Sequence, residues 1–277
     1  MIRIIINADD LGYDYITNAA IEDAFRVGCI TSATILANSN TWEDVHRIVD
    51  ANPNASFGVH LNLIEGKALT QSKVLFENGI VDKNNCFTKR IKTVRFPDEA
   101  LQNAIFEELN AQVCVVRMQE SIRITHFDSH QHTHMEAAWL DVLCRLAEKW
   151  NISYIRRRHN CWNTKSVNER LINIGVSLIK VIPPINSFVC ASLPHIRYKV
   201  LENSWISILE PMCNFTDYFN GYEQMLKIVR GGLIPPDNSV IELMCHPALF
   251  KEEYEMVKNH EIEKLIPNTK LVSYLDV

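Results

Sequence analysis

Short β-branched runs alternate with longer amphipathic stretches along most of the chain, and this order constrains the fold more than any other feature. Strands are expected at 3–7, 30–38, 57–63, 122–128, 152–156 and 240–245. Helices are expected at 16–25, 41–49, 97–120, 136–150, 222–229 and 252–265. A repeated order of strand and helix predicts an α/β fold whose strands pair in parallel through right-handed crossovers.

The composition and the spacing of these elements favour one domain. An apolar fraction of 47% and a charged fraction of 22% are typical of a globular protein. No repeat, low-complexity segment or linker interrupts the 277 residues, so we predict a single catalytic domain over residues 1–277. Residues 66–96 are less periodic and are expected to form an excursion over one end of the domain. Prolines break up residues 183–220, where no elements are predicted.

Charge and the N-terminal residues argue against several classes of protein. A formal charge of -5 gives no general attraction for nucleic acid, and we expect none as a partner. The basic cluster Arg156–Arg158 is better explained as a strand end beside an acidic site. The apolar start of MIRIIINADD is too short for a signal peptide or a membrane span, which predicts the first strand of a cytoplasmic protein without a membrane partner.

The cysteines offer little chemistry by sequence. Eight are scattered without a CxxC pair, so neither a zinc finger nor a disulfide framework is indicated. Cys245 lies beside a chemical motif, but no base is arranged around it, and a nucleophilic role is disfavoured.

Polar side chains gather where the predicted strands end. They are Asp9 and Asp10, His60, the histidines and aspartate of HFDSHQHTH at 126–134, and His246. The carboxyl ends of parallel strands meet at one edge of a sheet, so these groups are expected to share one catalytic centre. Within 126–134, Asp128 and His130 are better placed than His132 and His134, which lie nearest the next helix and are expected to be surface or turn residues.

A carboxylate and two imidazoles form a common open site for a catalytic divalent cation, and Asp10, His60 and His130 could supply it. Neighbouring residues of a strand point in opposite directions. Unless the chain turns at Asp9, we therefore expect one acid to bind the metal and the other to act on a water molecule.

Four motifs, NADDLG at 7–12, GVHLNLIEGKAL at 58–69, THFDSHQHTH at 125–134 and ELMCHP at 242–247, resemble the YdjC-like carbohydrate deacetylases, the family that contains chitooligosaccharide deacetylase. The resemblance implies a distorted (β/α) barrel with a mostly parallel sheet and fewer than eight regular strands. It also implies a homodimer and a divalent cation, usually magnesium, at Asp10, His60 and His130. Imidazole ligands would also suit zinc.

The resemblance further implies catalytic roles. Asp9 matches the general base. By analogy with related polysaccharide deacetylases, His246 matches a general acid and Arg156 an arginine that orients the base; a solvated strand end is the alternative for Arg156. A hydroxyl residue is expected after HLNL, but this chain has Ile64 there, which argues against a hydrogen bond to substrate from that position.

These observations predict a metal-dependent hydrolase that removes the acetyl group from an N-acetylated sugar and releases acetate. The sugar would be a chitooligosaccharide or another carbohydrate containing N-acetylglucosamine. Two alternatives stay open: a metal-dependent amide or ester hydrolase acting on a non-sugar substrate, and a non-catalytic sugar-binding relative. A binder would not need paired acids beside a metal ligand, which favours an enzyme.

Overall fold

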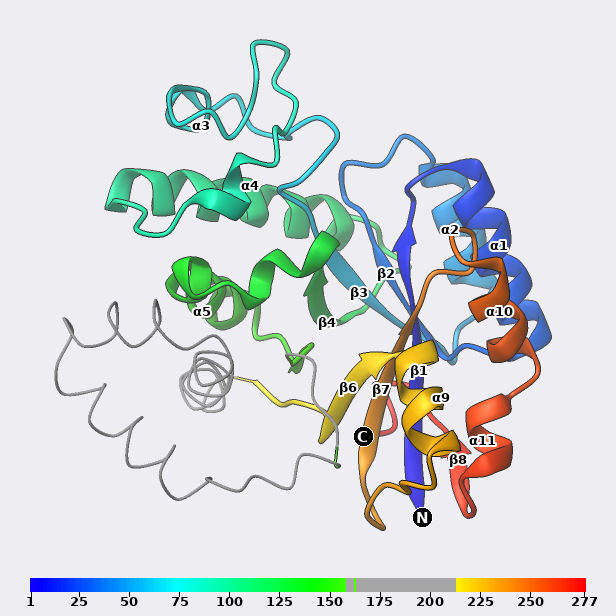
Figure 1. Ribbon diagram of the computed structural model, residues 1–277. Coiled ribbons are helices and arrows are strands. Elements are labelled where there is room, and N and C mark those ends of the chain that lie inside the picture. Colours follow the sequence, from blue (N-terminus) through cyan, green and yellow to red (C-terminus); the bar gives the residue numbers. More distant parts are fainter. Residues whose placement is uncertain (158–161, 163–212) are drawn as a thin grey trace, which may run out of the picture.

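A curled parallel sheet lies at the centre of the molecule, with helices around it (Figure 1). The computed structural model describes residues 1–157, 162 and 213–277. Its strands are β1 Ile2–Leu11, β2 Ser32–Ile35, β3 Ser56–Leu61, β4 Ile124–Ser129, β5 Tyr154–Ile155, β6 Tyr218–Gly221, β7 Val240–Cys245 and β8 Thr269–Leu271. Its α-helices are α1 Tyr15–Val27, α2 Trp42–Ala51, α3 Lys73–Glu77, α4 Glu99–Arg117, α5 Leu140–Trp150, α9 Tyr222–Arg230, α10 Lys251–Lys258 and α11 Glu261–Leu265. Short 3₁₀ turns are η1 Arg90–Thr93, η2 His130–Met135 and η3 Ala137–Trp139.

The strands pair in parallel in the order β5-β4-β3-β2-β1-β7-β6, and the three-residue β8 adds to the first part of β1. The two ends of this path come together. Asn214, just before β6, accepts a hydrogen bond from Ile155 N at 3.2 Å and donates one to the oxygen of Ser153 at 2.9 Å. The sheet is therefore a distorted α/β barrel with seven strands on its path, which confirms the predicted fold class.

The helices pack their apolar faces onto the outside of the sheet. In Figure 1, α4 and α5 lie on one side, and α1, α2, α10 and α11 lie on the other. Helix α2 illustrates the pattern, because Val45, Ile48 and Val49 fall on one helical face and are buried. No helix among the described residues is long and apolar enough to cross a membrane.

Several element boundaries differ from the prediction. Helix α4 begins at Glu99 because the Asp98 side chain accepts a hydrogen bond from Leu101 N, so Pro97 precedes the cap and does not start the helix. The expected helix over 252–265 is two helices, because His260 has a φ of 50° and breaks the α-helical ladder. The expected helix over 136–150 becomes regular only at Leu140, after two 3₁₀ turns.

The excursion over residues 66–96 contains α3 and η1 and lies beside α4 (Figure 1). It reaches the carboxyl end of the sheet at Lys92, whose ammonium donates a hydrogen bond to the side chain of Gln131. Residues 183–212 of the proline-rich stretch lie outside the described residues.

Glycine is required within β3 for a close approach. A Cβ atom on Gly58 would lie 2.6 Å from the oxygen of His126 and 2.7 Å from its ring. The His126 ring instead lies over the bare backbone and stacks on Tyr274 with ring centroids 4.0 Å apart. The glycine of GVHL thus allows β3 and β4 to pack closely just below His60.

Candidate active site

The carboxyl ends of the central strands surround a cavity of about 360 Å³. Five of the six residues predicted for the site line it: Asp9, Asp10, His60, His130 and His246. The rest of the lining is Tyr13, Thr17, Glu65, Gln131, His132, Leu249 and Phe250. The structure thus brings together side chains that are far apart in sequence, as the strand-end argument predicted.

Asp9 and Asp10 both reach the cavity because the chain turns between them. The pairing of β1 with β2 shifts register between Ala8 and Leu11, and Asp10 has a φ of 71°. A positive φ is uncommon for a residue with a Cβ atom and often marks a functional position. The opposed side-chain directions expected from a regular strand are therefore wrong, because the strand bulges at this point.

Asp10 faces two imidazoles. Its Oδ1 atom lies 3.2 Å from His60 Nε2 and 2.8 Å from His130 Nδ1. Burial alone would raise the pKa of Asp10. The contacts with the two imidazoles outweigh this effect and hold that pKa well below its usual range. His130 reaches this position because Gln131 and His132 have φ values of 51° and 59°, which turn the chain sharply after β4.

The donor atoms of Asp10, His60 and His130 lie within 4.8 Å of one another and fit a divalent cation. Burial opposes a charge on His60, but the carboxylates of Asp128 and Asp10 raise its pKa to about 10. The surroundings of His60 therefore favour a positive charge, which either a proton on the ring or a cation bound by the neutral ring would supply.

Asp9 is held by Arg156. The guanidinium Nη1 and Nη2 atoms donate to Asp9 Oδ2 and Oδ1, both at 2.7 Å, and Asn7 Nδ2 donates to Oδ1 at 2.9 Å. Burial would raise the pKa of Asp9, but Arg156 holds it well below its usual range. Because Arg156 is 0% exposed, the alternative of a solvated strand end is wrong.

Arg156 also joins two acids beneath the cavity. Its Nη1 lies 2.7 Å from Asp128 Oδ2, and its Nε donates to Glu242 Oε1 at 2.6 Å. A second group of potential metal ligands consists of Asp9, His60 and Asp128. Since Nη1 already lies 2.7 Å from both Asp9 and Asp128, the guanidinium supplies the cation there.

His246 follows β7 and lies above the paired acids. Its Nε2 atom is 4.0 Å from Oδ2 of both Asp9 and Asp10, and its ring packs edge-on against Phe250. The neighbouring Cys245 is fully buried, and burial raises the pKa of its thiol well above the usual value. The structure therefore supports the sequence argument against a nucleophilic cysteine.

The remaining histidines of the cluster have different surroundings. His132 lines the cavity. His134 is buried, with Nδ1 2.6 Å from Ser129 Oγ and Nε2 3.0 Å from the oxygen of Arg156. The expectation of a surface residue is wrong for His134, whose ring contacts the backbone of Arg156 directly after β5.

Sequence reasoning did not single out Glu65 or Glu242. Glu65 lines the cavity and places Oε1 2.8 Å from His130 Nε2. Glu242 could have been recognised as a charge inside the apolar strand IELMC, because a buried charge requires a partner. Ile64 is fully buried in the core, so its side chain does not face the cavity.

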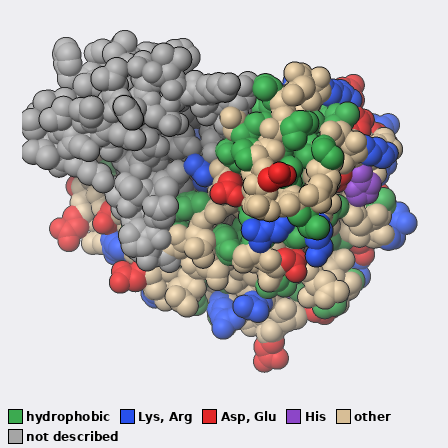
Figure 2. All heavy atoms as spheres, turned by 90° about the horizontal axis from the view of Figure 1, so that it is seen from below, with side chains coloured by type: hydrophobic (Ala, Val, Ile, Leu, Met, Phe, Trp, Pro, Cys, Tyr) green, Lys and Arg blue, Asp and Glu red, His purple; other side chains and the backbone are tan. Residues whose placement is uncertain are grey.

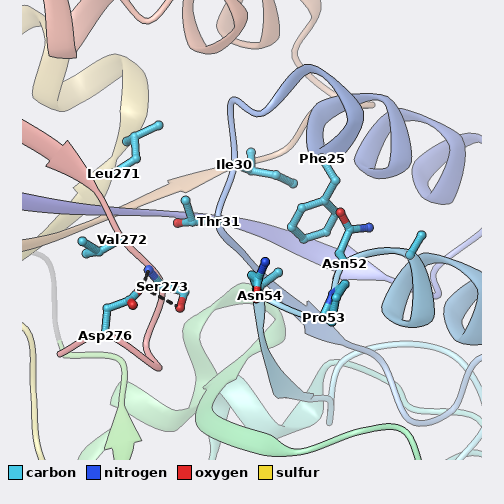
Figure 3. A pocket seen from close by; sticks show the side chains of 12 residues that line it. Phe25, Ile30, Thr31, Asn52, Pro53, Asn54, Leu271, Val272, Ser273 and Asp276 are labelled. Atoms are coloured by element: carbon cyan, nitrogen blue, oxygen red, sulfur yellow. Dashed lines mark hydrogen bonds between the residues drawn. The ribbon is translucent and has the colours of Figure 1, made fainter.

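A second cavity of about 340 Å³ lies at the other end of the sheet, between residues 51–55 and 271–276 (Figure 3). There Asp276 Oδ2 accepts hydrogen bonds from the backbone and hydroxyl of Ser273. The face seen from below in Figure 2 intersperses acidic and basic side chains. The paired acids and imidazoles belong to the first cavity, which is the candidate active site.

The protein is thus a curled α/β barrel with acids and imidazoles clustered at the carboxyl ends of its strands. The YdjC-like protein family matches residues 3–271, so the chain belongs to this family. A carbohydrate deacetylase from Brevibacillus brevis is 31% identical over 150 residues, 54% of this chain and 57% of that protein. One from Listeria welshimeri is 24% identical over 281 residues, 99% of this chain and 91% of that protein.

The matched region spans about 57% of the length of the first of these relatives. A solved structure of an Enterococcus faecalis protein, described as a candidate cellobiose-phosphate cleavage protein, is also similar. It has a TM-score of 0.67 at 20% identity and covers 99% of this chain and 98% of its own. This likeness supports the fold.

Proposed function

We propose that the protein is a metal-dependent carbohydrate deacetylase that hydrolyses the N-acetyl group of an amino sugar to acetate and a free amine. One observation carries the proposal. Asp9, clamped by Arg156, and Asp10, facing two imidazoles, open into the same cavity, with His246 4.0 Å from each acid. The names of the relatives from Brevibacillus brevis and Listeria welshimeri support a sugar substrate.

Asp10, His60 and His130 would hold the cation. When bound, a divalent cation would polarise the acetyl carbonyl and lower the pKa of water. The contacts with both histidines favour Asp10 over Asp9, whose oxygens already accept hydrogen bonds from Arg156. We infer magnesium from the family resemblance, with zinc as the alternative that two imidazoles would suit.

Asp9 and His246 would move the protons. Water attacks the acetyl carbonyl carbon while Asp9 takes a proton from that water. The carbon–nitrogen bond then breaks, and His246 gives a proton to the departing sugar nitrogen. Arg156 keeps the Asp9 carboxylate in one orientation through two parallel hydrogen bonds, which a lysine could not supply.

The walls of the cavity suit a sugar. Tyr13, Leu249 and Phe250 line it and are exposed, so they offer apolar surface beside the charged groups. A pyranose ring presents C–H groups on its faces and hydroxyl groups at its edge, and needs both kinds of wall.

The test is acetate release from a panel of N-acetylglucosamine, chitobiose, longer chitooligosaccharides and simple acyl esters, with magnesium or zinc added. We expect release from the N-acetylated sugars. Hydrolysis of esters alone would favour the hydrolase with a non-sugar substrate, and absence of any hydrolysis would favour a sugar-binding protein.

Metal dependence is tested separately by elemental analysis of the purified protein. His60→Ala should lose bound metal and activity together, because it removes one of three ligands. His46→Ala, which removes a histidine from α2 outside the cavity, is the matched control. Full metal content in His60→Ala would refute the ligand assignment. A homodimer, a cytoplasmic location and a single domain over residues 1–277 stay predictions.

A further inference from the structure

The two imidazoles at Asp10 present different ring nitrogens to it. His60 turns Nε2 toward Asp10 Oδ1 at 3.2 Å, whereas His130 turns Nδ1 toward the same oxygen at 2.8 Å. The rings meet edge to face, with centroids 5.5 Å apart and planes at 73°. One ring therefore needs the opposite tautomer from the other if both nitrogens beside Asp10 are to carry a lone pair.

The outer nitrogen of each ring faces a second carboxylate. His60 Nδ1 lies 2.8 Å from Asp128 Oδ1, and His130 Nε2 lies 2.8 Å from Glu65 Oε1. A carboxylate oxygen accepts a hydrogen bond. When a cation beside Asp10 takes the place of the hydrogens on the inner nitrogens, Asp128 and Glu65 would therefore hold the remaining ring hydrogens on the outer nitrogens.

We propose that Glu65 and Asp128 are positioning residues that fix opposite tautomers, Nε2–H in His130 and Nδ1–H in His60. Both remaining lone pairs then point toward the space beside Asp10. The inference rests on the proposed metal-dependent function, since these lone pairs would serve as the metal ligands. Carboxylates in this position also raise the basicity of a ligating imidazole and fix its orientation.

The position of Glu65 is determined by its backbone. Asn62 Oδ1 accepts a hydrogen bond from Glu65 N at 3.3 Å, and Asn62 Nδ2 donates to Glu65 O at 2.9 Å. Asn38 Nδ2 donates to the same oxygen at 3.3 Å. Gly66 follows with a φ of 78°, and a Cβ atom there would lie 2.7 Å from Asn38 Nδ2. The loop after β3 is thus held in a conformation that directs the carboxylate of Glu65 at His130.

The two carboxylates differ in how cleanly they can be removed. Asp128 is fully buried and also contacts Arg156 at 2.7 Å, so its loss would disturb the clamp on Asp9. The Glu65 side chain is 34% exposed at the cavity wall, and its replacement leaves the core intact. Glu65 is therefore the residue to test.

The first measurement is zinc affinity, by competition with a chromophoric chelator, for the full chain and two variants. Glu65→Ala should weaken zinc binding about 10- to 100-fold, as loss of such a partner typically does. Glu65→Gln removes the same charge but keeps an oxygen that accepts from His130 Nε2, so it should restore most of the affinity. Glu77→Ala, an exposed glutamate in α3, is the matched control. Equal losses in Glu65→Ala and Glu65→Gln, or no loss in either, would overturn the proposal.

The second measurement is the tautomer itself, read from ¹⁵N–¹H couplings of the imidazoles in zinc-loaded, ¹⁵N-histidine-labelled protein. His60 and His130 should show opposite tautomers, and in Glu65→Ala only His130 should change or broaden. The same tautomer in both rings would overturn the inference even if the protein releases acetate. Opposite tautomers in a protein that binds zinc but cleaves no N-acetylated sugar would support the inference and refute the proposed substrate.

Discussion

Arg156 offers the strongest test of how the buried charges are arranged. The guanidinium is 0% exposed and has four close contacts: two at 2.7 Å with Asp9, one at 2.7 Å with Asp128 and one at 2.6 Å with Glu242. Arg156→Met would keep an apolar side chain in the same space and remove the positive charge that these carboxylates share.

The expected loss of stability follows from the charges left behind. Removing one partner of a buried ion pair typically costs about 3 to 5 kcal/mol, because the other charge stays buried without compensation. Burial already raises the pKa of Glu242, so this acid can take up a proton and limit the loss. We therefore expect a decrease of about 3 kcal/mol or more in the free energy of unfolding, a large part of a total near 5 to 15 kcal/mol. The melting temperature should fall by about 6 °C or more.

The assay is urea unfolding at neutral pH in buffer containing a chelator, so that metal binding does not contribute. Arg47→Met is the matched control, since Arg47 is exposed on α2 and pairs with Glu22 and Asp44 at the surface. Such exposed pairs are worth about 0 to 1 kcal/mol. If Arg156→Met loses no more stability than Arg47→Met, the argument from buried charge is refuted.

The other predictions concern the roles of single residues and the effect of pH. Asp9→Asn should keep its metal content while turnover falls about 10²- to 10⁴-fold, whereas Asp10→Asn should weaken metal binding and recover part of its activity in excess metal; the reverse pattern would exchange the two roles. His246→Ala should lower kcat more than it raises KM, and a change in KM alone would mean that His246 only contacts substrate. Burial holds the pKa values of His126 and His134 well below 6.5, so the unfolded chain takes up protons first and stability falls as the pH drops below 6.5. In His134→Gln, the free energy of unfolding should fall with decreasing pH by about 1.4 kcal/mol per pH unit less than in the unchanged protein. Urea unfolding between pH 5 and 7 measures this dependence, and an unchanged dependence on pH would mean that His134 is charged in the folded protein.

The arrangement of the site was largely predictable because parallel strands end at a common edge. That rule brought together Asp9, His60, His130 and His246 without any knowledge of their contacts. The rule of alternating side chains failed at Asp10, since a bulge and a positive φ depend on the pairing of β1 with its neighbours. The alternation of side chains along a strand does not indicate where such a bulge occurs.

The supporting residues were harder to predict, for different reasons. Glu65 lies in a loop after β3, where no periodicity fixes a side-chain direction, and its place depends on hydrogen bonds from Asn62 and Asn38. Glu242 did leave a signal, a lone acid in an apolar strand, but its partner Arg156 is 86 residues away. Local patterns can show that such a charge needs a partner, while only the fold shows which one.

The charges around the cavity favour a bound cation. Asp9, Asp10 and Asp128 are all buried, at 2%, 5% and 0% exposure. Burial would raise the pKa values of Asp9 and Asp10, but Arg156 and the two imidazoles hold them well below their usual range. Arg156 contacts Asp9, Asp128 and Glu242, so three carboxyl groups share one guanidinium. The acids outnumber the arginine in a region where an unbalanced charge is costly, and a bound cation would lower that cost. Magnesium and zinc carry the same charge, so charge alone does not separate the magnesium inferred from the family resemblance from the zinc that imidazole ligands also suit. The donor atoms would decide between them, because magnesium prefers oxygen ligands and zinc also accepts imidazole.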